Sequence, residues 1–121
     1  MRIVLLILIV FVMIGTSFGR DSTKNTPTVK TFYPGYITDR RANICASISS
    51  NDGSVISRGF AIRKTDSRER EGHLEYRDRN VNDHYCIVLR LYPGISYTVR
   101  AYICTKNETI YGNPVFFKTM P

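Results

Sequence analysis

The stretch "LYPGISYTVRAYICTKNETIYGNPVFFKT", residues 91–119, is the most informative part of the chain, because the spacing of its turn and aromatic residues indicates the fold. Pro93 fixes φ and Gly94 permits a positive φ, so the chain can turn sharply after Leu91. In two-sheet antiparallel proteins, a tyrosine placed like Tyr97 folds back, and its hydroxyl bonds to backbone a few residues upstream. The spacing therefore predicts structural roles for Leu91, Pro93, Gly94 and Tyr97 at one end of a β-sandwich.

Short runs of alternating apolar and polar residues, typical of half-buried strands, recur along the rest of the chain. We predict strands at residues 28–32, 42–48, 55–63, 73–77, 85–91, 96–104 and 110–118. Seven such strands, separated by turn residues, predict an all-β, two-sheet antiparallel sandwich of the immunoglobulin-like class. The expected core is made of the inward-facing apolar residues: Ile44, Ile48, Phe60, Ile62, Val88, Leu91, Tyr97, Val99, Ile103, Val115 and Phe117.

The segment "RKTDSREREGHLEYRDRN", residues 63–80, interrupts this pattern with eleven charged residues. We expect a long connection that contains one short edge strand, whose charges discourage the addition of strands from other chains. A helix over residues 67–79 is the competing local interpretation. Gly72 and the absence of a wide apolar stripe weigh against that helix.

The first 21 residues, "MRIVLLILIVFVMIGTSFGRD", have the anatomy of a secretory signal peptide. A positive charge at Arg2 precedes an apolar run of about twelve residues, fewer than the roughly 20 needed to span a bilayer. We predict a signal peptide at residues 1–19, a flexible lead-in at 20–26 and one domain at 27–121. The mature chain is then expected to be secreted, periplasmic or at the cell surface, without a transmembrane anchor.

The charge of the chain is strongly positive, with a formal net value of +7. Loss of Arg2 with the signal peptide leaves 16 of the 17 basic residues against 10 acidic ones, a net charge of +6. Such a balance favours contact with anionic surfaces, including glycans and acidic lipids. A secreted protein has little access to nucleic acid, so no nucleic-acid partner is expected.

Three segments together resemble the fibronectin type III-like modules of secreted Bacteroidetes proteins: "SNDGSVISRGFAI", "LYPGISYTVRAY" and "YGNPVFFKT". The resemblance covers roughly residues 27–119. It departs from the family's usual pattern in the charged connection and in a tighter spacing before Leu91. The resemblance implies a sandwich fold and a non-catalytic binding, spacing or adhesive role, without specifying a ligand.

A candidate binding face follows from the predicted strand at residues 96–104. Arg100 and Tyr102 are expected to point outward beside Gly59 and Ala61, whose small side chains leave room across the sheet. Arginine and tyrosine are enriched at binding hot spots. The candidate binding residues are Arg58, Arg63, Arg77, Arg79, Arg100 and Tyr102.

The function predicted from these features is a secreted, non-catalytic module that binds a protein or a glycan. The alternative is a secreted inhibitor or effector that blocks an enzyme with a loop, either residues 105–111 or residues 33–41. Asn107-Glu108-Thr109 matches the N-glycosylation sequon, which matters only in a host that glycosylates such sites.

The sequence offers little for catalysis or metal binding. His73, His84 and three cysteines lack the spacings of structural zinc sites. No residues suggest an oxyanion hole beside a Cys–His pair. We therefore expect no catalytic residue, no metal and no cofactor.

The three cysteines cannot all pair within one chain. Cys45 and Cys104 are expected on the outer faces of opposite sheets, beyond the ~7 Å Cα limit for a disulfide. The spacing before Leu91 is one residue shorter than the family pattern. Counting alternate residues back from Leu91 with this shorter spacing makes Val88 and Cys86 face the core. We therefore predict no intramolecular disulfide, with Cys86 buried and the other two cysteines partly exposed. The opposite facing of that strand permits a Cys45–Cys86 bond.

Overall fold

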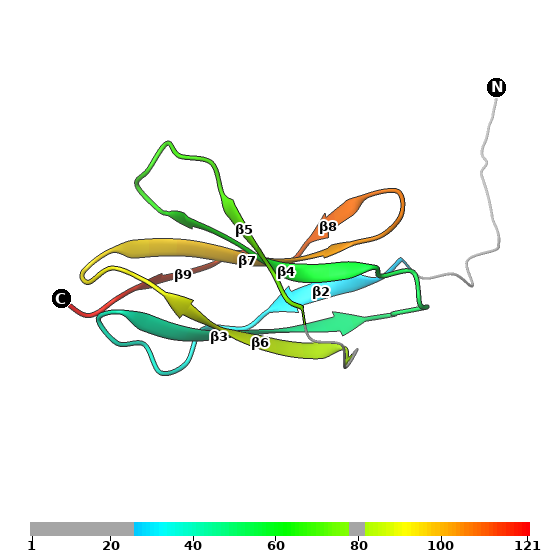
Figure 1. Ribbon diagram of the computed structural model, residues 1–121, viewed down its shortest axis with the longest axis horizontal. Coiled ribbons are helices and arrows are strands. Elements are labelled where there is room, and N and C mark those ends of the chain that lie inside the picture. The colour runs from blue at the N-terminus through cyan, green and yellow to red at the C-terminus, as the bar shows by residue number, and fades with distance from the viewer. Residues whose placement is uncertain (1–25, 78–81) are drawn as a thin grey trace, which may run out of the picture.

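The protein is described here by a computed structural model, which places residues 26–77 and 82–121 (Figure 1). The predicted signal peptide and most of the lead-in lie outside the described residues. The two described ranges contain eight β-strands and no helix. The strands are β2 (Thr28–Thr31), β3 (Arg41–Ser49), β4 (Ser57–Lys64), β5 (Gly72–Glu75), β6 (His84–Arg90), β7 (Ser96–Cys104), β8 (Thr109–Tyr111) and β9 (Val115–Lys118).

These strands form two antiparallel sheets that face each other as two layers (Figure 1). One sheet has the order β2-β3-β6, and the other has the order β5-β4-β7-β8, with β9 also paired to β7. Strands β8 and β9 lie along the same edge of β7 and share one strand position, which gives seven positions in all. The predicted fold class, a two-sheet antiparallel sandwich of about seven strands, is confirmed.

The interruption between β8 and β9 explains the "YGN" motif at residues 111–113. The side chain of Asn113 accepts a hydrogen bond from the Thr31 N–H (2.8 Å) and donates one to the Thr31 carbonyl (3.0 Å). A β-carbon at Gly112 would lie 2.6 Å from the Val29 carbonyl oxygen, closer than side-chain atoms approach backbone. The motif therefore lets β2 of one sheet pack closely against β7 and β8 of the other.

The corner at residues 91–97 has the geometry that the sequence predicts. Leu91 is buried, and Gly94 adopts a φ of +66°, which glycine permits without a steric penalty. The Tyr97 side chain is buried, and its hydroxyl accepts a hydrogen bond of 2.9 Å from the Tyr92 N–H. This bond ties the β6–β7 connection to the start of β7.

The substitution Tyr97→Phe is expected to lower the free energy of unfolding by roughly 1–3 kcal/mol, because the partly buried Tyr92 N–H loses its acceptor. Urea denaturation of both proteins measures the difference. The topology should not change, so the far-ultraviolet circular dichroism spectra should coincide. Equal denaturation midpoints and slopes would show that the corner bond contributes nothing.

The strand β6 has the opposite facing from the one we predicted. Tyr85 and Leu89 are buried, whereas Val88 is 58% exposed and Cys86 also lies on the outer face. The strand is regular, so counting back by twos from Leu91 passes through Leu89 to Tyr85 without skipping a residue. The inward placement of Val88 and Cys86 is therefore wrong.

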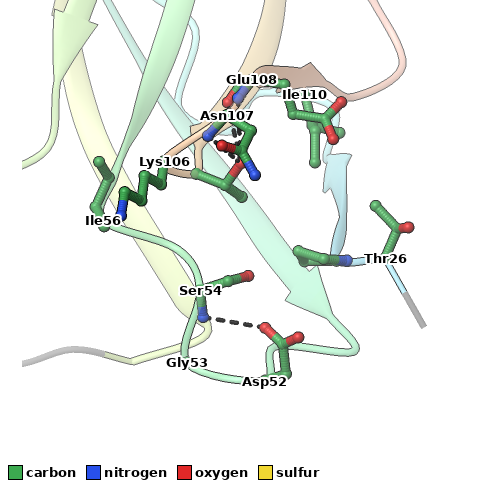
Figure 2. Close-up of a pocket in the computed structure, with 11 residues that line it drawn as sticks. Thr26, Asp52, Gly53, Ser54, Ile56, Lys106, Asn107, Glu108 and Ile110 are labelled. Carbon is green, nitrogen blue, oxygen red and sulfur yellow. Dashed lines mark hydrogen bonds between the residues drawn. The ribbon is translucent and has the colours of Figure 1, made fainter. Parts of the chain in front are cut away.

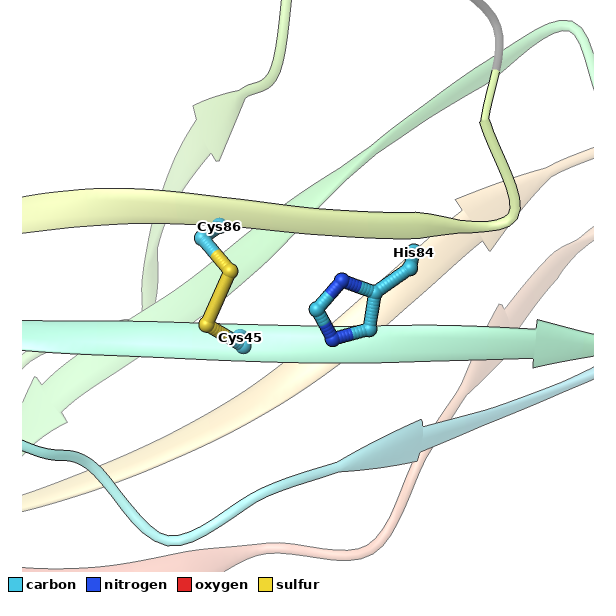
Figure 3. A group of neighbouring side chains, drawn as sticks. All are labelled: Cys45, His84 and Cys86. Atoms are coloured by element: carbon cyan, nitrogen blue, oxygen red, sulfur yellow. A yellow bond between two sulfur atoms is a disulfide. The ribbon is translucent and has the colours of Figure 1, made fainter.

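This facing brings two cysteines together, and a disulfide joins Cys45 to Cys86 (Figure 3). The two residues are direct partners in the β3–β6 ladder, with Cα atoms 4.0 Å apart. The Ile48 N–H donates to the Asp83 carbonyl, so these two residues form a hydrogen-bonded pair of the ladder. Hydrogen-bonded and non-hydrogen-bonded pairs alternate, and the cysteine pair lies three residues further along. It is therefore a non-hydrogen-bonded pair, in which side chains approach most closely. The prediction of no disulfide is wrong. Cys104 is free and half-buried.

Candidate binding surfaces

The outer face of the five-stranded sheet gathers polar aromatic side chains around one arginine. The His73 ring lies edge-on to Tyr102, with centroids 5.1 Å apart, and its Nε2 is 3.1 Å from the Tyr111 hydroxyl. The guanidinium of Arg100 lies over the Tyr111 ring, 3.7 Å from the centroid. We call this surface the aromatic–arginine face; it consists of Glu71, His73, Arg100, Tyr102, Tyr111 and Phe116.

Arg100 is held in place by Glu71. Its Nε donates to Oε2 at 2.8 Å and its Nη2 donates to Oε1 at 2.6 Å, a two-pronged geometry that fixes the plane of the guanidinium. The hydrogen bond from Arg100 lowers the pKa of the Glu71 carboxyl below its ordinary value of 4.5. About a third of the Arg100 side chain stays exposed, so part of this fixed side chain remains accessible from solvent.

Tyr102 points to the same outer face but is only 6% exposed. It lies across Gly59, its partner in the β4–β7 register, where an added β-carbon would be 2.8 Å from the Tyr102 hydroxyl. Burial raises the pKa of the Tyr102 hydroxyl. Tyr102 therefore supports Tyr111 and His73 from below and offers little surface to a ligand.

A shallow hollow of about 390 Å³ lies beside Arg100 on this face. Thr98 and Pro114 lie in its lining, together with Arg63 and Phe116. The Phe116 side chain is 60% exposed, so its ring is accessible from solvent. The hollow thus combines a fixed cation with an accessible aromatic ring.

The predicted binding residues separate into several groups. Arg63, Arg100 and Tyr102 lie on the outer face, and the first two line the hollow. Arg77 is exposed beyond the end of β5, with its Nε 3.4 Å from the Glu75 carboxylate. Arg79 lies outside the described residues. The binding role of all of them stays a prediction.

Arg58 is placed differently from our prediction, because it points into the sandwich. It is 7% exposed, its guanidinium lies 5.9 Å from the Tyr85 ring centroid, and Nη1 donates to the Asn82 carbonyl. Arg58 shares the parity of Phe60 on β4, so the period of two already indicated an inward position. It is not part of the aromatic–arginine face.

A pH effect is expected from the Arg100–Glu71 pair. Because the folded-state pKa of Glu71 is lowered, its stabilisation is present above the ordinary pKa of 4.5 and is lost as pH falls through the folded value. Glu71→Gln should therefore flatten the acid limb of the stability curve. Thermal unfolding measured from pH 7 to pH 3 tests this, with Glu108→Gln in an exposed turn as control. An unchanged acid limb in Glu71→Gln would contradict the expectation.

A second hollow, of about 480 Å³, lies at the end of the sandwich near the β7–β8 turn (Figure 2). Its lining mixes Lys106 with Asp52 and Glu108, so neither charge dominates. Asn107 of the glycosylation sequon is exposed in this turn. The turn is compact, since the Thr105 N–H donates to the Glu108 carbonyl at 2.9 Å.

The outer face of the other sheet carries a group of three side chains that resemble metal ligands (Figure 3). The ligand atoms of Cys45, His84 and Cys86 lie within 4.8 Å of one another. The disulfide occupies both sulfur atoms, which leaves the imidazole as the one available ligand in the group. Strand parity already placed His84 and Cys86 on one face, but the inward facing predicted for Cys86 hid their proximity to Cys45.

No protein-family model matches the chain, and no curated protein sequence matches it. Solved structures with a similar fold include one described as "Myokine structure", with a TM-score of 0.56 and 18% identity. That comparison covers 82% of this chain and 100% of the other. Another is the sensor domain of the anti-sigma factor RsgI4 of Pseudobacteroides cellulosolvens, with a TM-score of 0.55 and 10% identity, covering 83% of this chain and 98% of that one. At these identities the likeness shows the β-sandwich fold alone.

Over the described ranges 26–77 and 82–121, no helix is long and apolar enough to cross a membrane.

Proposed function

We propose that the protein is a secreted or cell-surface, non-catalytic binding module that recognises a protein or a glycan, and that its aromatic–arginine face takes the protein. The observation that carries this proposal is the fixed guanidinium of Arg100, held by Glu71 and stacked on Tyr111. An arginine held in its bound geometry loses little conformational entropy on binding. Phe116, 60% exposed beside it, supplies apolar surface that a partner can cover.

Two further considerations support a binding role. The resemblance to fibronectin type III-like modules implies binding without catalysis. One solved structure of similar fold is the sensor domain of an anti-sigma factor, so this fold serves as a sensor in that protein. The apolar leader at residues 3–14 supports export.

The test is affinity capture from the native envelope and medium, repeated with two double variants. Arg100→Ala/Phe116→Ala removes a cation and an aromatic ring from the aromatic–arginine face. The matched control, Lys30→Ala/Val88→Ala, removes a cation and an apolar group from the exposed surface of the other sheet. We expect the first variant to lose the captured partner and the control to retain it. Equal capture by all three proteins would refute a role for this face.

One loop favours the inhibitor or effector role as a second candidate. Tyr36 is 85% exposed and holds a φ of 50°, which is rare for tyrosine. The loop is braced by two backbone bonds of 2.9 Å between Gly35 and Asn43, and by a 3.1 Å bond from Met120 N–H to the Thr38 carbonyl. A rigid loop that projects one aromatic side chain suits insertion into a pocket of another protein. Inhibition assays against secreted proteases, comparing wild type with Tyr36→Ala, test this role.

A further inference from the structure

A cleft of about 310 Å³ lies between the β4–β5 connection and the β6–β7 connection. Its apolar lining comes from Ile62, Leu91 and the ring of Tyr92, which is 63% exposed. The β4–β5 connection, which supplies one wall, stands out from the two layers of the sandwich (Figure 1). We call this site the basic cleft because of the charged residues that surround the apolar surface.

Four basic residues and one acidic residue line the basic cleft: Arg63, Lys64, Arg70, Arg90 and Glu69. Arg63 is engaged locally, since its Nη1 donates to the Thr65 carbonyl at 3.1 Å. Lys64 places its ammonium over the Tyr92 ring, 5.4 Å from the centroid. In the described part of the chain, Lys64, Arg70 and Arg90 form no ion pair with a carboxylate.

A further arginine lies beside the basic cleft on the neighbouring strand β3. Arg41 is the direct partner of Arg90 in the β3–β6 register. The pair lies four register steps from the disulfide, and hence also at a non-hydrogen-bonded position, where facing side chains are closest. Like charges placed directly opposite destabilise a sheet. Among the described residues no carboxylate forms an ion pair with either arginine, so an anion from outside would relieve the repulsion.

The distribution of these cations indicates what kind of anion fits. They come from separate segments, β3, β4, the β4–β5 connection and β6, so a single carboxylate can contact only one or two of them. A chain with a charged group on each repeating unit can contact several at once. The exposed ring of Tyr92 between them offers an apolar face, on which the C–H face of a sugar ring can pack.

We propose that the basic cleft, together with Arg41, is a binding site for an acidic polysaccharide that carries a carboxylate or sulfate on successive sugar units. The anionic groups pair with Arg41, Arg70 and Arg90, and a sugar ring packs on Tyr92 beside Lys64. Arginine suits both groups because its planar donors bind two oxygens of one anion. This site shares Arg63 with the hollow beside Arg100 but contains none of the residues that define the aromatic–arginine face, so it does not depend on the function proposed for that face.

The test is isothermal titration calorimetry at about 0.15 M salt, where exposed charges beyond about 8 Å are screened. The probes are oligogalacturonate for the carboxylate, dextran sulfate for the sulfate, and neutral dextran. The protein is purified after expression of the full chain. We expect binding of at least one acidic probe and none of neutral dextran. Arg70→Gln/Arg90→Gln should weaken that binding about tenfold or more, equivalent to about 1.4 kcal/mol.

Two controls make the result specific. Lys30→Gln/Lys106→Gln removes the same number of charges from exposed positions outside the cleft and should change the affinity less than about twofold. Arg100→Ala/Phe116→Ala should retain polysaccharide binding even if it loses a protein partner. Circular dichroism and thermal unfolding establish that each variant is folded.

Three outcomes would overturn the proposal. If neither acidic probe bound, the proposed polysaccharide site would be refuted. If the cleft variant and the lysine control lost the same affinity for the acidic probe, the binding would be explained by non-specific attraction to net charge. Tighter binding of a polyglutamate peptide, with the same dependence on Arg70 and Arg90, would assign the cleft to an acidic protein segment instead.

Discussion

Removal of the Cys45–Cys86 bridge is expected to lower the free energy of unfolding by about 4 kcal/mol. The bridge closes a loop with a sequence separation of 41 residues, and the chain-entropy relation for that length gives about this value. The double variant Cys45→Ser/Cys86→Ser tests the expectation by urea denaturation. The far-ultraviolet circular dichroism spectrum should remain β-type. Both residues lie on the outer face of their sheet, so the substitutions leave the core between the two sheets unchanged.

The free cysteine provides the control for this experiment. Cys104→Ser removes a thiol of similar size from β7 without removing a cross-link, and it should change stability by less than about 1 kcal/mol. Mass spectrometry of the alkylated native protein should show one free thiol, located at Cys104. A double variant as stable as the wild type would mean that the bridge does not constrain the unfolded chain.

The architecture was predictable because its signals are local and repeated. The period of two in β7 fixes which side chains face the core, and the predicted bounds of that strand, 96–104, match the observed ones. The turn residues at 93 and 94 fix the corner, and the spacing to Tyr97 determines where its hydroxyl can bond. Each feature depends on a few neighbouring residues, so it can be derived without knowledge of the rest of the fold.

The errors concern strand facing and contacts between segments far apart in sequence. An assumed irregularity before Leu91 reversed β6, and a shift of one residue moves every side chain to the other face. That reversal hid both the disulfide and the exposure of Val88. The Asn113–Thr31 contact joins residues 82 positions apart, and no local pattern predicts such a pairing.

The candidate binding surface was predictable in part. Outward facing of Arg100 followed from strand parity, but its ion pair with Glu71 depends on where the charged β4–β5 connection folds back. Tyr102 was expected to be accessible, yet neighbouring aromatic rings cover it. The basic cleft could not be predicted from the sequence, because its cations come from three segments, β4, the β4–β5 connection and β6, that only the tertiary fold brings together.

Tyr85 connects the two sheets and is the other position where we expect a large loss of stability. The residue extends from β6 across the core, is 2% exposed, and packs against Phe60 and Tyr76 with ring centroids 5.2 and 5.3 Å away. Its hydroxyl lies 3.0 Å from the Gly59 carbonyl and 3.2 Å from the Tyr102 carbonyl. Burial raises the pKa of this hydroxyl, so it remains protonated and able to donate under ordinary conditions.

Tyr85→Ala is expected to cost about 3–5 kcal/mol, the range for removing a large buried aromatic side chain. The substitution also takes away the ring beside the inward-facing guanidinium of Arg58, which then borders a cavity.

Tyr85→Phe keeps the ring and removes only the hydroxyl donor, so its cost should be about 1 kcal/mol. Tyr33→Ala, at a tyrosine that is 66% exposed, should cost under about 1 kcal/mol and serves as the control. Urea denaturation of the four proteins separates the contribution of packing from that of the hydroxyl. If Tyr85→Ala were no more destabilising than Tyr85→Phe, the ring would not be part of the packed core between the sheets.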